Sequence, residues 1–500
     1  MAPQELDRRY LDTSLPLGDR VDILVGQMTL REKIAQTLHH APPIPRLDVP
    51  AYNWWNECLH GVARAGKATV FPQAVGLAAS FDPELLYRVA AAIADEGRAK
   101  HHQAARQGER GIYFGLTYWT PNINIVRHPY WGRGQEAYGE DPYLTARLGV
   151  AFCRGLQGDH PKYLKAVATP KHYAVHNGPE HLRHEFDARV SRRDMYETYL
   201  PAFQACVQEA GAESVMGAYN RTNGEPCCGS RTLLQEILRD EWGFDGYVVS
   251  DCGAINDFHA HHKITDSPEE SAAMAVRNGG DLNCGETYRA LLGAVQQGLL
   301  TEAELDTSVK RLFTARFKLG LFDPDDEVPY SRIPETVVCC EEHRQLALQA
   351  ARESIVLLEN DGILPLAPTV SGIGVIGPTA FDAKMQLANY YGYSPHIATI
   401  VEGIVAAVGA GTRVVSARGC ELTGDAPIYS ADVAGMAGDD MHALVAVLGN
   451  TAELEGEEGG EANSDGGGDR ESAALPGRQQ ELLEALVATG RPVVLVLTTG

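Results

Sequence analysis

Gly246-Tyr247-Val248-Val249-Ser250-Asp251-Cys252-Gly253-Ala254 is the stretch around which the rest of the chain is organised. Its apolar run over 247–249 predicts a short buried strand. The strand delivers one carboxylate, Asp251, at its C-terminal end, and small residues follow. That end of a strand is where α/β proteins place their chemistry, although an aspartate there can also cap the next helix. Taken alone, the stretch supports both interpretations equally.

The composition predicts a large globular protein. A chain of 500 residues exceeds one ordinary domain. Hydrophobic residues make up 44% and charged residues 22%, which is typical of a chain with a sizeable core. The formal net charge of −23 argues against nucleic acid and anionic membranes as partners and suits a neutral small substrate.

The sequence favours a cytoplasmic location. Residues 1–20 are polar and lack the apolar core of a signal peptide, and no run is long enough for a membrane span. The ten cysteines lack zinc-site spacing and are expected to be reduced, mostly buried thiols. Export by another route stays open.

Over roughly the first 300 residues, short apolar runs alternate with helical stretches, and polar residues follow the runs. The run 163–168 precedes Lys171-His172, and the run 214–216 precedes Tyr219. This alternation predicts a (β/α) barrel, with an open doubly wound sheet as the competitor. No Gly-x-Gly-x-x-Gly follows a strand, which weakens a nucleotide-binding version.

A second series of strands and helices follows a proline-containing linker. We expect a barrel domain over 1–320, the linker over 321–350 and an α/β sandwich domain over 351–500. The sandwich strands are predicted at 355–358, 373–376, 413–415, 443–448 and 493–497, with a helix at 479–488. The sequence stops directly after a strand, so we expect this domain to be incomplete at its C-terminus.

Several polar clusters suit a sugar. The loop 53–61 combines Trp54 and Trp55 with a carboxylate and a histidine, although each tryptophan is equally plausible as core. Lys171-His172 offers two donors for adjacent hydroxyls. The acidic, glycine-rich segment 453–470 is more simply a solvated loop than one that brings a carboxylate into a site.

These motifs, taken in order, resemble those of glycoside hydrolase family 3. The matching stretches are 27–34, 57–61, 121–124, 131–136, 139–142, 171–173, 216–220, 243–251 and 354–366. The resemblance implies a (β/α)8 TIM-like barrel followed by an α/β sandwich, with the active site between them. It also implies a retaining, exo-acting β-glycosidase that removes a sugar from a non-reducing end and needs no metal or cofactor.

The resemblance assigns roles to individual residues. Asp251 falls on the nucleophile position, in agreement with its predicted place at a strand end, since retaining chemistry needs a rigidly held carboxylate. Glu457 is the preferred acid/base, with Glu455 and Glu458 as the other candidates. The substrate-binding positions are Glu57, Trp119, Arg133, Lys171, His172, Arg183 and Tyr219.

Glu57 decides the expected substrate. Glucosidases of the family commonly have an aspartate in this loop, whereas the xylosidase-like branch has a glutamate. The longer side chain reaches further towards O4 and leaves less room for a hydroxymethyl group. We therefore expect a β-D-xylosidase acting on xylo-oligosaccharides or aryl glycosides, with α-L-arabinofuranosidase as a side activity. A β-glucosidase is the alternative, and the loop 171–185 lacks the pattern of the N-acetylglucosaminidase branch.

Two other classes of function are weighed against this one. The first is a truncated, non-catalytic sugar-binding protein. The second is a metal-dependent barrel hydrolase using histidines, for which the spacing is irregular; its candidates are His172, His176, His181 and His184. The oligomeric state is left open, a dimer included.

Overall fold

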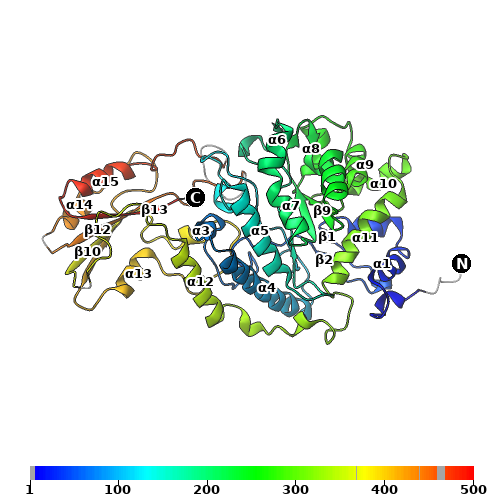
Figure 1. Ribbon diagram of the computed structural model, residues 1–500, viewed down its shortest axis with the longest axis horizontal. Coiled ribbons are helices and arrows are strands. Elements are labelled where there is room, and N and C mark those ends of the chain that lie inside the picture. The colour runs from blue at the N-terminus through cyan, green and yellow to red at the C-terminus, as the bar shows by residue number, and fades with distance from the viewer. Residues whose placement is uncertain (1–5, 368, 439, 459–467, 500) are drawn as a thin grey trace. The chain divides into compact units, whose positions relative to one another are not determined.

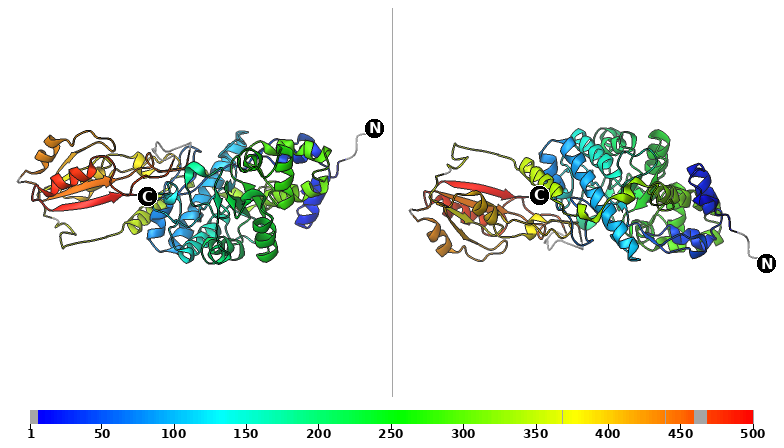
Figure 2. Two further views of the ribbon diagram at one scale, coloured as in Figure 1. Left: turned by 90° about the horizontal axis from the view of Figure 1, so that it is seen from above. Right: turned by 90° about the horizontal axis from the view of Figure 1, so that it is seen from below.

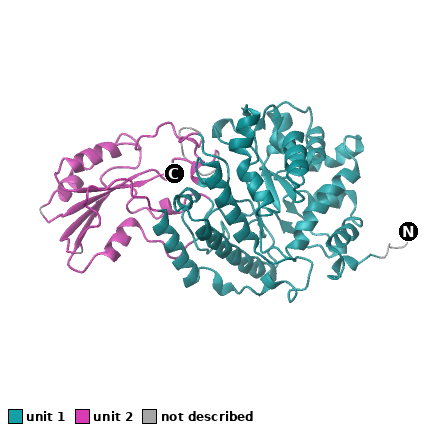
Figure 3. Cartoon of the chain, viewed as in Figure 1, with its two compact units in different colours: residues 1–127, 136–354, 390–393 teal, residues 128–135, 355–389, 394–500 magenta. Residues whose placement is uncertain are grey.

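A computed structural model describes residues 6–367, 369–438, 440–458 and 468–499. The chain forms two compact units (Figure 3). Unit 1 consists of residues 1–127, 136–354 and 390–393, and unit 2 consists of residues 128–135, 355–389 and 394–500. Each unit therefore contains one short segment that lies within the sequence range of the other.

Unit 1 is rich in helices (Figure 1). They are α1 (Leu17–Val25), α2 (Leu30–Gln36), α3 (Ala74–Ala79), α4 (Pro83–Arg106), α5 (Pro142–Gln157), α6 (Arg192–Asp194), α7 (Pro201–Gln208), α8 (Ala254–Ala260), α9 (Pro268–Asn278), α10 (Leu291–Gln296), α11 (Glu302–Lys318) and α12 (Glu341–Ser354). Unit 1 also contains two π-helical segments, Met195–Tyr199 and Thr232–Glu241, and several short 3-10 helices. The long helices α4 and α5 pack side by side (Figures 1 and 2).

Helix starts follow their sequence signals. Thr29 and Glu32 form a capping box at α2, in which each side chain satisfies an amide that the helix leaves unpaired. Asp82 accepts hydrogen bonds from the Glu84 and Leu85 amides at the start of α4, and Pro83 takes the first helical position, where no amide hydrogen is needed.

The strands of unit 1 are short: β1 (His40–Ala41), β2 (Tyr52–Asn53), β3 (Thr117–Tyr118), β4 (Val167–Ala168), β5 (Asp187–Ala188), β6 (Ser214–Gly217), β7 (Arg221–Thr222), β8 (Glu225–Pro226) and β9 (Tyr247–Ser250). β3 pairs with β4 and β6 pairs with β9, both in parallel. Single parallel bridges extend these contacts, among them 122 with 171, 173 with 217, 249 with 282 and 38 with 283. Parallel pairing brings the carboxyl ends of successive strands together at one edge.

Unit 2 is built on a parallel sheet. Its strands are β10 (Gly372–Ile376), β11 (Arg413–Ala417), β12 (Ala443–Gly449) and β13 (Val493–Thr498), in the order β11-β10-β12-β13. Leu444, Ala446 and Leu448 share a cluster with α14 (Ser430–Met436) and α15 (Gln479–Val487). Val445 and Val447 share another with α13 (Ile400–Ala407). Successive side chains of β12 thus point to opposite faces, and helices cover both (Figure 1).

One predicted strand is wrong. Residues 355–358 form no strand, and their side chains Ile355, Val356, Leu357 and Leu358 are 78%, 57%, 65% and 80% exposed. The apolar run has strand-like composition, but a strand also needs a hydrogen-bonding neighbour, and no described residue pairs with it. Elsewhere, the helices of the described residues include none that combines the length and apolarity required to cross a bilayer.

We predict that Gly377, at the end of β10, is essential to the stability of unit 2. Its φ is +149°, and a Cβ there would lie 1.8 Å from the Val447 carbonyl oxygen. Gly377→Ala should lower the free energy of unfolding by about 2 kcal/mol or more. Chemical denaturation followed by circular dichroism measures this.

Gly403→Ala is the matched control, because a Cβ at this position in α13 meets nothing within 4 Å. Helix propensity should make it stabilising by about 0.5–1 kcal/mol. Equal stabilities for the two variants would show that the close approach at Gly377 does not constrain the sheet.

Candidate active site

Asp251 lies at the carboxyl end of β9 and is 7% exposed. Its amide donates a hydrogen bond of 3.0 Å to the Gly217 carbonyl oxygen, which ties its backbone to β6. The Cys252 amide donates a 2.8 Å hydrogen bond to Oδ1. A carboxylate held on both backbone and side chain at the end of a buried strand is rigid, as the sequence led us to expect.

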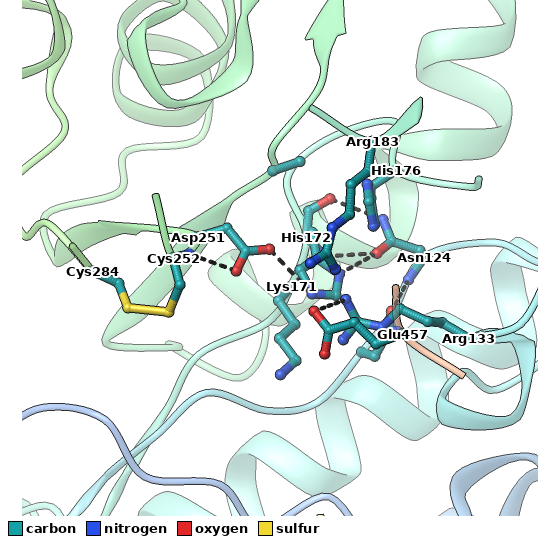
Figure 4. Close-up of polar contacts among 12 residues, drawn as sticks. Asn124, Arg133, Lys171, His172, His176, Arg183, Asp251, Cys252, Cys284 and Glu457 are labelled. Atoms are coloured by element: carbon teal, nitrogen blue, oxygen red, sulfur yellow. Dashed lines mark hydrogen bonds and ion pairs between the residues drawn. A yellow bond between two sulfur atoms is a disulfide. The ribbon is translucent and has the colours of Figure 1, made fainter. Parts of the chain in front are cut away.

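His172 faces Asp251, with 3.7 Å between His172 Nε2 and Asp251 Oδ2 (Figure 4). The Asn124 amide group donates to the carbonyl oxygens of His172 and Ala174, so its Oδ1 is an acceptor. His172 Nδ1 lies 2.9 Å from that Oδ1 and must carry a proton. Asn124 is a positioning residue that the sequence analysis did not single out.

Glu57 and Lys171 form a buried ion pair. Lys171 Nζ lies 3.0 Å from Glu57 Oε1 and 3.2 Å from Oε2, and each residue is 2% exposed. The Tyr390 ring covers the ammonium group, with 4.9 Å between Nζ and the ring centroid. Burial strengthens both the ion pair and the cation–π contact.

Tyr390 reaches this position through a strap, the segment 390–393, which interrupts the sequence of unit 2 but belongs to unit 1. The strap is held by backbone hydrogen bonds: Arg64 N to Tyr391 O, Ala68 N to Tyr393 O and Tyr393 N to Gly66 O, at 2.9, 2.9 and 2.8 Å. Tyr390 was not predicted as a neighbour of Lys171, because no local sequence pattern connects the two residues.

The two tryptophans of the loop have different surroundings. Trp54 is 1% exposed and packs edge-on against Tyr52 and Tyr247 in the core. Trp55 is half-buried and stacks on Trp119, with 5.6 Å between ring centroids and 17° between planes. Within the described chain, the buried Trp119 Nε1 has no hydrogen-bond acceptor.

Arg183 and Tyr219 contact each other. The Arg183 guanidinium lies 4.5 Å from the centroid of the Tyr219 ring, and its Nη1 lies 3.7 Å from the buried Glu180 carboxylate. His184 packs edge-on against the same tyrosine, and its Nδ1 lies 2.8 Å from Asp257 Oδ2 on α8. Tyr219 is therefore held on two sides.

The expectation that all ten cysteines are reduced is wrong. Cys252, the residue after Asp251, forms a disulfide with Cys284 (Figure 4). The Gly253 amide also donates to the Cys284 carbonyl oxygen at 2.8 Å. The two cysteines are 32 residues apart in sequence, but the bridge between Val249 and Leu282 brings their segments together.

The thiols nearest the site are unreactive. Burial raises the pKa of the Cys58 thiol well above its usual range, and the adjacent Glu57 carboxylate raises it further. Burial also raises the pKa of the Cys228 thiol well above its usual range, and the neighbouring Cys227 raises it further. Because the thiolate is the nucleophile, neither residue can serve as one at neutral pH.

Unit 2 holds Arg133 and Glu457 together. Arg133 is 1% exposed, and its Nη1 lies 3.4 Å from Glu457 Oε1 (Figure 4). The Glu457 side chain is 17% exposed. It therefore combines a fixed cationic neighbour with access to solvent.

The other two glutamates have different surroundings. Glu455 is 6% exposed, and its carboxylate lies 3.8 Å from Arg470 Nε. Its carbonyl oxygen accepts a 3.2 Å hydrogen bond from Gln135. Glu458 is half-buried. Part of the acidic, glycine-rich segment, residues 459–467, lies outside the described residues.

Two of the four histidines considered for a metal site bond to other side chains. His172 bonds to Asn124 and His184 to Asp257. Among the residues that the structure describes, no group of three or more histidine, cysteine or acidic side chains is arranged to hold a metal ion.

The sequence matches two family descriptions. Residues 25–315 match "Glycosyl hydrolase family 3 N terminal domain", and residues 355–500 match "Glycosyl hydrolase family 3 C-terminal domain". "Xylan 1,4-beta-xylosidase" of Xylanibacter ruminicola is 45% identical over 423 residues, which cover 83% of this chain and 49% of that protein. "Probable beta-D-xylosidase 7" of Arabidopsis thaliana is 38% identical, covering 98% of this chain and 65% of its own length.

Two solved structures that resemble this chain also have glycosidase names. "GH3 exo-beta-xylosidase (XlnD) in complex with xylobiose aziridine activity based probe" has a TM-score of 0.89 and 30% identity, covering 97% of this chain and 62% of that one. A β-glucosidase of Listeria innocua in complex with glucose has a TM-score of 0.81 and 30% identity, covering 96% and 69%.

The chain spans less than two thirds of the length of these xylosidase-named relatives. The first family description alone nevertheless covers more than half of the chain, and the second covers a separate range after it. The resemblance seen in the sequence motifs is therefore confirmed, and the chain belongs to glycosyl hydrolase family 3.

Proposed function

We propose that the chain acts as a retaining, exo-acting β-D-xylosidase that removes terminal non-reducing xylose from xylo-oligosaccharides or aryl xylosides. The observation that carries this proposal is the rigid Asp251 carboxylate beside His172, in the same unit as the buried Glu57–Lys171 pair. The names of the relatives support the substrate class.

In the proposed reaction, Asp251 attacks the anomeric carbon while Glu457 donates its proton to the departing glycosidic oxygen. The bond from the anomeric carbon to that oxygen breaks, and a covalent xylosyl–enzyme ester forms. Water then attacks the same carbon, Glu457 takes its proton, and Asp251 leaves. The two displacements return the sugar with its original anomeric configuration.

We assign the binding of the sugar to hydrogen-bond donors and acceptors of unit 1. Lys171 and His172 donate to adjacent hydroxyls, and Glu57 accepts from O4. The Trp119 indole N–H, which has no acceptor among the described residues, can donate to a substrate hydroxyl. Arg183 and Tyr219 form a further wall of the sugar-binding site.

We assign the positioning of Glu457 to Arg133. The guanidinium at 3.4 Å holds the carboxylate in place, and solvent access lets the proton return after the first step. Glu455 also faces an arginine, but it is the weaker candidate because its side chain is less exposed, at 8% against 17% for Glu457.

The closed (β/α)8 barrel, the sandwich and the division at 1–320, 321–350 and 351–500 also remain proposals. The parallel bridge from Leu38 to Asn283 supports a ring, because it connects the first part of unit 1 to its last part. Helices on both faces of the β10–β13 sheet support the sandwich.

The cytoplasmic location stays a proposal as well. Buried free thiols, seven of the eight in the chain, suit a reducing compartment. The Cys252–Cys284 disulfide argues for an oxidising one. Cell fractionation with an antibody against the chain distinguishes the two.

The central prediction concerns Asp251. Asp251→Ala should lower kcat on p-nitrophenyl β-xyloside by about 10⁴-fold or more, because the covalent intermediate can no longer form. Azide should restore turnover and yield the xylosyl azide of inverted configuration. The control is Asp245→Ala, an exposed aspartate just before the same strand. Full activity in Asp251→Ala would refute the assignment.

A second prediction separates the three glutamates. Glu457→Ala should lose activity on xylobiose and keep its first-step rate on an aryl xyloside with a good leaving group, which needs no protonation. Glu455→Ala and Glu458→Ala should affect both substrates to the same degree. If Glu457→Ala cleaves xylobiose like the wild type, another residue is the acid.

A third prediction tests the substrate against the β-glucosidase alternative. The kcat/KM for aryl β-xyloside should exceed that for the glucoside by about tenfold or more, and Glu57→Asp should narrow this ratio by making room. Glu213→Asp is the matched control, since it shortens another buried glutamate that pairs with a lysine, Lys318. A wild-type preference for the glucoside would make the chain a glucosidase.

A further inference from the structure

A cavity lies within unit 2, at the carboxyl ends of the strands of its sheet. Its volume is about 430 Å³, within the about 300–1,000 Å³ range of small-molecule sites. The loop after β10 supplies Pro378, Thr379 and Asp382, the loop after β11 supplies Arg418 and residues 421–423, and the loop after β12 supplies Glu453 and Leu454.

The topology explains why a cavity forms there. β10 is followed in sequence by β11 on one side, and β11 is followed by β12 on the other side of β10. The loops that follow β10 and β12 therefore lead to opposite sides of the sheet. In open parallel sheets, ligands bind in the crevice where the strand order reverses in this way.

Hydrogen bonds from Gln479 and Thr379 hold the loops that line the cavity. Buried Gln479, at the start of α15, donates to the Leu422 and Gly449 carbonyl oxygens at 3.0 Å and accepts from the Gly449 amide at 2.7 Å. The Thr379 hydroxyl donates to the Val447 carbonyl oxygen at 3.2 Å. All three loops are thus linked to one another, and the cavity is formed without a ligand.

The lining selects the class of ligand. Three carboxylates, Asp382, Glu421 and Glu453, stand against one guanidinium, Arg418, so an anionic ligand is disfavoured. Arg418 and Glu421 lie 2.8 Å apart and present donors and acceptors side by side, as vicinal hydroxyls require. Among the described residues, no acidic cluster is arranged as a metal site. The Tyr429 hydroxyl bonds to Glu421 at the edge of this lining.

We propose that this cavity binds a neutral polyhydroxylated ligand, a pentose or short xylo-oligosaccharide, and that its occupancy orders the backbone leading to Glu457. Glu453 and Leu454 line the cavity and directly precede the 455–457 stretch. The Gly456 amide is already bonded to the Gly468 carbonyl oxygen at 3.0 Å, so a ligand on residues 453–454 adds a second restraint. The choice of a xylose-based ligand and the link to Glu457 both rest on the proposed function.

The test uses the full chain with its catalytic site blocked. A 2-deoxy-2-fluoroxylosyl fluoride should esterify Asp251, which intact-mass spectrometry detects as one added fluoroxylosyl group. Calorimetric titration with xylotriose should then reveal one remaining saturable site. Arg418→Ala should weaken that site by about tenfold or more, because a charge-assisted hydrogen-bond donor is lost.

The matched control is Arg413→Ala, an exposed arginine at the start of the same strand that pairs with Asp440. It should leave xylotriose affinity within about twofold of the wild type, since it removes no ligand contact. Amide hydrogen exchange at 455–457 should slow on adding xylotriose to the labelled protein, and this slowing should vanish in Arg418→Ala.

The outcomes are distinct. No saturable binding to the labelled wild type, or equal affinities for the two arginine variants, overturns the site. Tighter binding of calcium or inorganic phosphate than of xylotriose overturns the ligand class. Binding without slower exchange at 455–457 overturns the link to Glu457. A missing mass shift counts against Asp251 instead, and the two arginine variants then decide the cavity on unlabelled protein.

Discussion

The buried pair of Glu57 and Lys171 is the interaction on which the rest of unit 1 depends. Neither group can stand alone, since an unpaired charge at 2% exposure would lose its hydration without compensation. The pair therefore fixes the loop 53–61 against the segment that ends in Lys171. The ring of Tyr390 completes the enclosure and excludes water from one side of the ammonium group.

A buried ion pair of this kind contributes more to ligand recognition than to the free energy of unfolding. Replacing such a pair by apolar residues would in general cost little or even stabilise a fold. Its charges are useful when they meet a ligand whose hydroxyls can be donor and acceptor at once. A neutral sugar meets this condition, and it also tolerates the strongly negative chain, whose net charge of −23 would repel an anionic substrate.

Sequence predicted the features that depend on local order. The place of Asp251 at a strand end was predicted because a buried strand followed by small residues is a local signal, and the capping residues that begin α2 and α4 are equally local. Features that depend on partners distant in sequence could not be predicted. Tyr390 lies far from Lys171 in sequence, the disulfide partner of Cys252 has no spacing signature, and residues 355–358 have strand composition but no neighbour. Trp54 and Trp55 are chemically identical neighbours, so only packing could separate core from site.

The placement of Glu457 follows from backbone packing rather than from its own side chain. A Cβ at Gly132 would lie 1.9 Å from the Gly468 carbonyl oxygen and 2.5 Å from that of Gly456, so the segment 128–135 approaches the loop as closely as backbone permits. Only glycine allows this approach, and the Gly132 amide uses it to donate to Asp469 Oδ1 at 3.0 Å. Arg133 is the next residue, so its guanidinium is brought to Glu457 by the contact that glycine makes possible. Two segments more than 300 residues apart in sequence thus form one rigid arrangement, in which Arg133 holds the Glu457 carboxylate in place.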